Sequence, residues 1–164
     1  MNARAEAGID ELDGRLIALL AAEPRIGVLE CSRRLRVARG TVQARLDKLT
    51  ERGVIVGFGP TIAPGALGYE VTAFVTLEIR QSRGHDPAAA HLATIPEVLE
   101  VHTITGGGDL LCRIVARSNA DLQRVIDQVV AYAGVVRAST IIALAEQIPY
   151  RTLPLVQAVA ALSR

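Results

Sequence analysis

The chain of 164 residues is 50% hydrophobic and 21% charged, which is typical of a folded globular protein and excludes a disordered tail. No apolar run approaches the roughly 18 residues of a membrane-spanning helix, and the polar N-terminus lacks the apolar core of a signal peptide, so we expect a cytoplasmic protein that does not span a membrane. The net charge is only +1, but residues 24–57 carry eight basic and three acidic side chains, which indicates either a phosphate-binding surface or a solvated basic helix face.

Three short helices are predicted near the N-terminus. Apolar residues at helical spacing between Ile9 and Leu20 predict a first helix, with Asp10 as its N-cap and Pro24 after its end. A second helix is expected over residues 28–35 and a third over residues 39–52. Short helices joined by tight turns are typical of a helix-turn-helix unit.

A linker is expected to separate this unit from the rest of the chain. Residues 54–58 are predicted to form a strand that leaves the unit. Glycine and proline are then concentrated in residues 58–69, which we interpret as the linker. The predicted domains are therefore residues 1–57 and residues 70–164.

The second domain alternates strands and helices in the order βαββαβ. The expected strands are residues 71–80, 97–105, 109–117 and 135–146, and the expected helices are residues 86–95 and 119–132. This order is typical of a ferredoxin-like fold with helices on one face of the sheet only. The last strand is apolar on both faces, so we expect it to be central in the sheet or covered on both sides. A second subunit would cover the open face and would use the excess of aliphatic residues.

Five sequence segments stand in a specific order between residues 9 and 155. They are IDELDGRLIALLAAEPRIG, VLECSRRLRVARGTVQARLDKLTERGVIVGF, PGALG, HTITGGGDLLCRIV and GVVRASTIIAL. Together they resemble the leucine-responsive regulator/AsnC (Lrp/AsnC, feast/famine) family of transcription regulators. The resemblance implies an α+β protein with an N-terminal helix-turn-helix (winged-helix-like) domain and a C-terminal ferredoxin-like βαββαβ domain.

The same resemblance implies a function and partners. It points to a transcriptional regulator that binds double-stranded DNA and is modulated by a small molecule, an amino acid bound between subunits of the C-terminal domain. The family forms homodimers that assemble further, so an octamer is expected. The alternative is a ligand-sensing oligomer with weak or non-specific DNA binding, because Arg36 replaces the family's turn glycine, Ala38 its capping serine, and Gly40 a common serine or threonine.

Candidate DNA contacts lie on the outward side of the third helix and on the basic residues before it. They are Arg33, Arg34, Arg39, Thr41, Gln43, Arg45 and Lys48. Gln43 can form a bidentate pair with adenine, Arg39 can reach guanine or phosphate, and the others are expected to bind phosphates. Arg45 matches a family arginine but lies near the buried stripe, so a structural ion pair is an equal alternative.

Candidate effector contacts lie in the glycine-rich turn between two strands and on the last strand. They are Ile104, Thr105, Gly106, Gly107, Gly108, Asp109 and Thr140. Of the turn, Gly106 and Asp109 match the family. A carboxylate can pair with a ligand ammonium, and glycine N–H groups can hold a ligand carboxylate. The alternative is a flexible hairpin turn beside ordinary sheet residues.

Enzymatic and metal-dependent functions are not expected. The chain has no P-loop, G-x-G-x-x-G, H-E-x-x-H or G-x-S-x-G pattern, and its histidines lack the spacing of metal ligands. A small ferredoxin-like enzyme or enzyme-regulatory subunit would need a clustered acid/base set. We therefore expect no catalytic residues, metal or cofactor, and we interpret Cys31 and Cys112 as buried hydrophobic residues.

Overall fold

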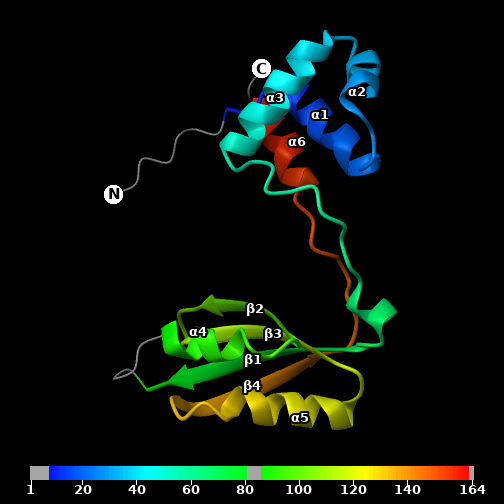
Figure 1. The fold of residues 1–164 in the computed structure, drawn as a ribbon. Coiled ribbons are helices and arrows are strands. Elements are labelled where there is room, and N and C mark those ends of the chain that lie inside the picture. Colours follow the sequence, from blue (N-terminus) through cyan, green and yellow to red (C-terminus); the bar gives the residue numbers. More distant parts are fainter. Residues whose placement is uncertain (1–7, 81–85, 163–164) are drawn as a thin grey trace. The chain divides into compact units, whose positions relative to one another are not determined.

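The structure, a computed structural model, describes residues 8–80 and 86–162. The chain divides into two compact units, Met1–Pro60 with Ile148–Arg164 and Thr61–Gln147, which we describe separately (Figure 1). No helix within the described ranges is both long enough and apolar enough to cross a membrane.

The first unit begins with three helices at the expected positions. They are α1 (Glu11–Ala22), α2 (Val28–Leu35) and α3 (Arg39–Glu51). Asp10 is the N-cap of α1, as expected, and forms a capping box with Asp13 in which each carboxylate accepts the other residue's backbone N–H. The core between the helices contains Leu16, Cys31, Leu35, Val42 and Leu49. This packing fixes α3 against α1 and α2.

The strand expected over residues 54–58 is wrong. No strand in the described part of the chain pairs with this segment, and Val56 and Phe58 are 95% and 65% exposed. A strand needs a neighbour to satisfy its backbone hydrogen-bonding groups. The apolar residues of this segment therefore do not form a strand pair within one chain.

A helix that the sequence analysis did not predict, α6 (Leu153–Leu162), lies in the first unit. It packs against α1 (Figure 1), where Ala160 and Gly14 are buried. The compact second unit ends at Gln147, so residues 148–164 of the predicted C-terminal domain, residues 70–164, pack with the first unit. The physical reason is that α6 buries its small apolar residues on α1.

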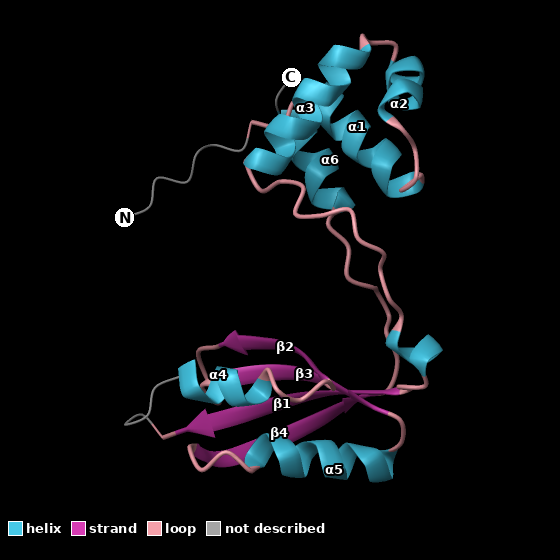
Figure 2. Ribbon diagram, in the orientation of Figure 1, coloured by secondary structure: helices cyan, strands magenta, loops and turns pink. Residues whose placement is uncertain are grey.

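The second unit is a four-stranded antiparallel sheet with two helices (Figure 2). Its elements are β1 (Val71–Ile79), α4 (Asp86–Leu92), β2 (Val98–Thr103), β3 (Leu110–Ala116), α5 (Asn119–Val130) and β4 (Val135–Ala143). The strand order is β2-β3-β1-β4, and the glycine turn joins β2 to β3 as an antiparallel hairpin. The predicted ferredoxin-like fold and α+β class are confirmed.

The core of the second unit lies between the sheet and its two helices. Fully buried residues of β1 and β3, such as Val75 and Ile114, pack against Leu92 of α4 and Val125 of α5. Cys112 is fully buried here, and burial raises the pKa of its thiol to about 11. It is thus an inert core residue, as expected for both cysteines.

The last strand is not central. β4 pairs only with β1, at the edge of the sheet. Its Ile141 is 66% exposed beside the 37% exposed Phe74 of β1, on the face opposite Val75 and the helices. The apolar character of both faces of β4 therefore does not come from burial within the chain.

Candidate functional site

The turn between α2 and α3 is closed by a strained arginine. Arg36, which replaces the family's turn glycine, has φ 59° and ψ 45°, in the left-handed region. Its N–H donates to the Arg33 carbonyl at 3.3 Å, and the N–H of Val37 donates to the Ser32 carbonyl at 3.1 Å. These bonds end α2 and direct the chain into α3. A left-handed conformation costs a non-glycine residue about 1 kcal/mol or more.

The first turn of α3 has no side-chain cap. Ala38 occupies the N-cap position with an extended backbone, and its methyl side chain cannot accept a hydrogen bond from the first-turn N–H groups. The N–H of Thr41 donates to the Ala38 carbonyl at 3.0 Å, so the N–H groups of Arg39 and Gly40 are the ones available to an external acceptor such as a phosphate oxygen. Arg39, the first residue of α3, is exposed next to them.

A shallow hollow of about 500 Å³ runs along the outward side of α3. It is lined by Asp10, Gly40, Thr41, Ala44, Arg45 and Lys48. Gly40, Ala44 and Lys48 are spaced four residues apart and lie on one face, opposite the buried Val42 and Leu49. Because Gly40 and Ala44 have small side chains, this face of the helix lets another molecule approach its backbone closely. Thr41 and Lys48 are exposed on it. Asp10 entered the sequence analysis only as a cap, because its approach to α3 is tertiary.

Gln43 is also exposed on α3, but its amide is engaged. Its Nε2 donates to the Asp47 carboxylate at 2.8 Å, one turn along the helix. To form a bidentate contact with adenine, the Gln43 amide would have to break its hydrogen bond to Asp47 and form hydrogen bonds to the base instead. The geometry therefore allows the predicted role of Gln43 only after a side-chain rearrangement.

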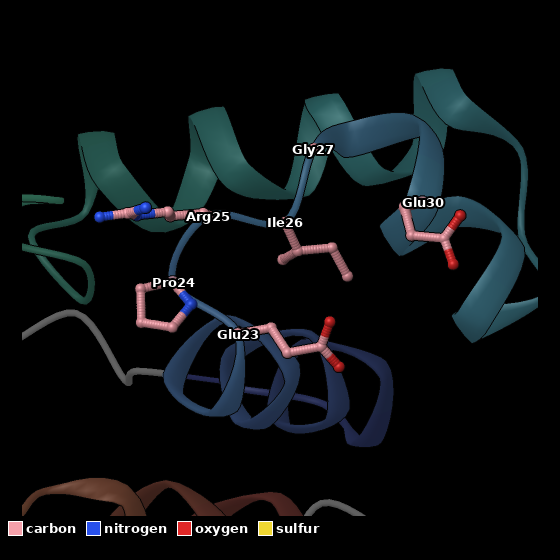
Figure 3. A pocket seen from close by; sticks show the side chains of 6 residues that line it. All are labelled: Glu23, Pro24, Arg25, Ile26, Gly27 and Glu30. Carbon is pink, nitrogen blue, oxygen red and sulfur yellow. The ribbon is translucent and has the colours of Figure 1, made fainter.

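Two of the predicted phosphate contacts are paired with carboxylates. Arg34 donates from Nη1 to Glu23 at 3.0 Å and from Nε to Glu30 at 3.1 Å, and Arg33 lies 3.6 Å from Glu30. The hydrogen bond to Glu30 and the charge of Glu23 raise the pKa of Arg34. Figure 3 shows Glu23 and Glu30 around the turn between α1 and α2, with Arg25 directed away from them. Carboxylates at this turn thus offset the charge of both arginines.

Arg45 forms the structural ion pair that the sequence analysis left as one of two alternatives. Its Nη1 donates to Asp10 at 2.6 Å and to Asp13 at 2.7 Å. Partial burial opposes ionisation of Asp10, but hydrogen bonds from the Asp13 N–H and from Arg45 hold the pKa of Asp10 below its usual value. The guanidinium therefore ties α3 to the first turn of α1.

In the second unit, Asp109 fixes the glycine turn to β1. Its N–H donates to the Leu77 carbonyl at 2.8 Å, and its Oδ2 accepts the N–H of Ile79 at 2.6 Å. Its carbonyl accepts the N–H of Ile104 at 2.9 Å. These bonds position the turn at the end of β1 and use one carboxylate oxygen of Asp109.

Two positions of the turn require glycine, each for a different structural reason. Gly106 has φ +113°, which L side chains rarely adopt. At Gly108 a Cβ would collide with Cγ2 of Thr76 and lie 3.1 Å from the Leu77 carbonyl oxygen. A larger residue at position 108 would displace the turn from β1. Gly107 has open space around its Cα.

The structure brings six of the seven predicted effector contacts together. Ile104 and Asp109 are half-buried, whereas Thr105 and Gly107 are exposed in the same turn. Thr140 is separate, because it lies on β4 opposite Val75, and β1 stands between β4 and the β2–β3 hairpin. No group of three or more metal-ligating side chains occurs in the described ranges.

Comparisons with known proteins match both units. A model of the Lrp/AsnC ligand-binding domain matches residues 72–153, and a winged helix-turn-helix DNA-binding model matches residues 9–56. The HTH-type transcriptional regulator FL11 of Pyrococcus horikoshii is 32% identical over 83% of this chain and 89% of its own length.

Solved structures of regulators in this family are also similar to this chain. The structure of Escherichia coli AsnC has a TM-score of 0.82 and 26% identity, covering 89% of this chain and 99% of its own. A feast or famine regulatory protein from M. tuberculosis, complexed with L-methionine, has a TM-score of 0.77 and 28% identity, covering 88% and 97%.

Proposed function

Because this chain belongs to the Lrp/AsnC family of transcriptional regulators, we propose that α3 binds double-stranded DNA and that an amino acid bound at the glycine turn modulates this activity. The observation that carries the DNA-binding part is the face of α3 formed by Gly40, Ala44 and Lys48. It is exposed, carries no bulky side chain at Gly40 and Ala44, and presents the positive charge of Lys48, as suits a helix that enters the major groove.

The arginines and lysine of the helix-turn-helix unit divide into two groups under this proposal. Arg39 and Lys48 contact phosphates, with Thr41 beside them, and Gln43 reads a base after releasing Asp47. The other three arginines form ion pairs with carboxylates, so they support the fold and contribute less to the affinity for DNA. They are Arg33, Arg34 and Arg45.

The effector-binding part rests on Asp109 and the N–H groups of residues 106–108. Asp109 holds the turn with Oδ2, so Oδ1 is the oxygen that we assign to the ligand ammonium. The glycine N–H groups receive the ligand carboxylate. The relative solved with L-methionine supports an amino acid as the class of effector.

Assembly completes the proposal. The open face of the sheet, with Phe74 and Ile141, is covered by a second copy in a homodimer, and dimers associate further, up to an octamer. Thr140 then contributes to a site that includes a neighbouring subunit rather than to the turn of its own chain. A regulator of this kind acts on DNA in the cytoplasm.

A fluorescence anisotropy titration of the full chain tests DNA binding, using a duplex from upstream of its own coding region and a scrambled duplex at two salt concentrations. Preference for the upstream duplex is expected, with affinity that falls steeply as salt rises, because each neutralised phosphate adds about 0.9 to the slope of log K against log salt. Arg39→Ala should reduce that slope more than Arg33→Ala, whose arginine is paired with Glu30. Equal, weak binding to both duplexes would favour the ligand-sensing alternative, to which the uncapped N-terminus of α3 also points.

A further inference from the structure

Helix α6 belongs to a different compact unit from the strand that precedes it in the chain. β4 ends at Ala143, residues 144–152 follow, and α6 then joins the helix-turn-helix unit. The chain thus enters the helix-turn-helix unit twice, once through α1 to α3 and once through α6. The second segment, α6, is connected through residues 144–152 to β4, the edge strand of the effector-binding domain.

The contact between α6 and α1 has no spare room. A Cβ added to Gly14 of α1 would lie 2.8 Å from the Cβ of Ala160, the buried residue of α6. Leu153 and Val156 are half-buried on the same face of α6, at helical spacing from Ala160. A groove of about 240 Å³ alongside is lined by further small residues, including Ala18 and Ala161. The two helices therefore approach each other through small side chains.

The α6 contact lies next to the anchor of α3. Gly14 directly follows Asp13, and Asp13 together with Asp10 accepts the guanidinium of Arg45, which belongs to α3. A displacement of α6 is therefore transmitted to α1 beside the two carboxylates that orient α3. These ion pairs link the first turn of α1 to α3.

We propose that α6 is a coupling helix, which transmits the state of the effector-binding domain to the DNA-binding helix through the Gly14–Ala160 contact and the Asp10–Asp13–Arg45 ion pairs. This inference rests on the proposed function, since it requires DNA binding by α3. Gly14 and Ala160 are positioning residues in this mechanism and do not touch DNA. Because coupling is reciprocal, DNA bound at α3 must also alter β4 through α6.

Hydrogen–deuterium exchange on the full chain, with and without the upstream duplex at saturation, tests the proposal without knowledge of the effector. The wild-type chain should show DNA-dependent changes in exchange at β4 and residues 144–152, besides those at α3. Ala160→Lys should abolish the changes at β4 and 144–152 while DNA still binds. Ala158→Lys is the matched control, because Ala158 is exposed on the same helix, and it should behave as the wild type.

Gly14→Ala provides an independent variant that favours helix formation in α1, since alanine has the higher helix propensity, and yet its Cβ meets Ala160. It should reproduce the loss seen with Ala160→Lys, with circular dichroism reporting an intact fold. Unchanged β4 exchange on DNA binding in the wild type, or changes that persist in both variants, would overturn the coupling role and leave the linker 58–69 as the route. A wild-type chain that fails to bind the duplex would instead contradict the proposed function.

Discussion

At the scale of single residues, the helix-turn-helix unit contains two locally unfavourable positions, Arg36 and Ala38, and folds in spite of them. Arg36 holds a left-handed backbone that glycine adopts freely, and Ala38 leaves α3 uncapped. The departures of both residues from the family pattern were visible in the sequence. The structure adds that neither changes the path of the chain, because Leu35, Val42 and Leu49 remain in the core on either side of the turn.

Arg36→Gly should stabilise the unit by up to about 1 kcal/mol, because it removes left-handed strain, with a partial offset from the greater freedom of glycine in the unfolded chain. Urea unfolding followed by circular dichroism measures the change. Arg36→Ala keeps the strain and removes only the side chain, so it should not show this gain. A glycine variant less stable than the alanine variant would refute the strain interpretation.

The ion pair of Asp10 with Arg45 should make stability depend on pH in the acid range. The pKa of Asp10 is lowered in the folded chain, so its contribution is present above the unfolded value of about 3.9 and is lost as the pH falls through the folded value. Asp10→Asn retains an N-cap acceptor but not the charge, so it should be less stable than the wild type at pH 7, with the difference disappearing in acid.

Thermal unfolding of both proteins between pH 2 and 7 measures this effect, over a range set by the usual Asp pKa of about 3.9. Asp127→Asn is the control, since Asp127 accepts a bond from Gln123 on an exposed face of α5 and does not pair with an arginine among the described contacts. A pH-independent difference between Asp10→Asn and the wild type would mean that the charge of Asp10 does not stabilise the fold.

Asp109→Asn should separate the two roles of Asp109. The amide oxygen can still accept the N–H of Ile79 and keep the turn on β1, but it cannot neutralise an ammonium. Loss of a charge-assisted contact of about 1.5 to 3 kcal/mol weakens the ligand roughly 10-fold to 150-fold. The measurement is calorimetric titration with the amino acid that a thermal-shift screen of the twenty identifies. Equal affinities would place the ammonium elsewhere, and Asp109→Ala, which also frees the turn, provides the comparison.

At the scale of elements, periodicity identified those helices and strands whose pattern reflects burial within one chain. α5 shows the complete helical stripe, and Leu122, Val125 and Val129 are indeed buried. The glycine turn between β2 and β3 required a hairpin, which the register confirms. The turn's attachment to β1 was not predictable, because it depends on Asp109 meeting Ile79 thirty residues away in sequence.

The elements that sequence reasoning missed or misplaced are those whose apolar residues face outward or meet a distant segment. β4 is apolar on both sides yet lies at an edge of the sheet. Residues 54–58 are apolar yet pair with no described strand, and α6 packs on a helix from the other end of the chain. The pattern of hydrophobic residues indicates which side chains are buried, but it does not indicate which segment or subunit covers them.

At the scale of the whole molecule, the open face of the sheet is chemically incomplete in one chain. Phe74 and Ile141 face each other across β1 and β4, and on the other side of Phe74 stands Arg113 of β3. The Nε of Arg113 is buried without a hydrogen-bond partner among the described residues, although its Nη1 lies 3.7 Å from Glu100. A second copy on this face would bury the apolar side chains and could supply an acceptor for Arg113.

Ile141→Glu should therefore dissociate the assembly, because a second copy would have to bury an unpaired carboxylate against Phe74 and Ile141's own counterpart. A penalty of about 3 kcal/mol raises the dissociation constant more than 100-fold, since each 1.4 kcal/mol is tenfold. Light scattering of the full chain at micromolar concentration measures the change in mass. Val130→Glu is the matched control, because Val130 is 39% exposed on α5, which covers the opposite face of the sheet, and this variant should keep the wild-type mass. If Ile141→Glu also keeps that mass, copies of the chain do not associate through the open face, and the effector site cannot include a neighbour positioned by it.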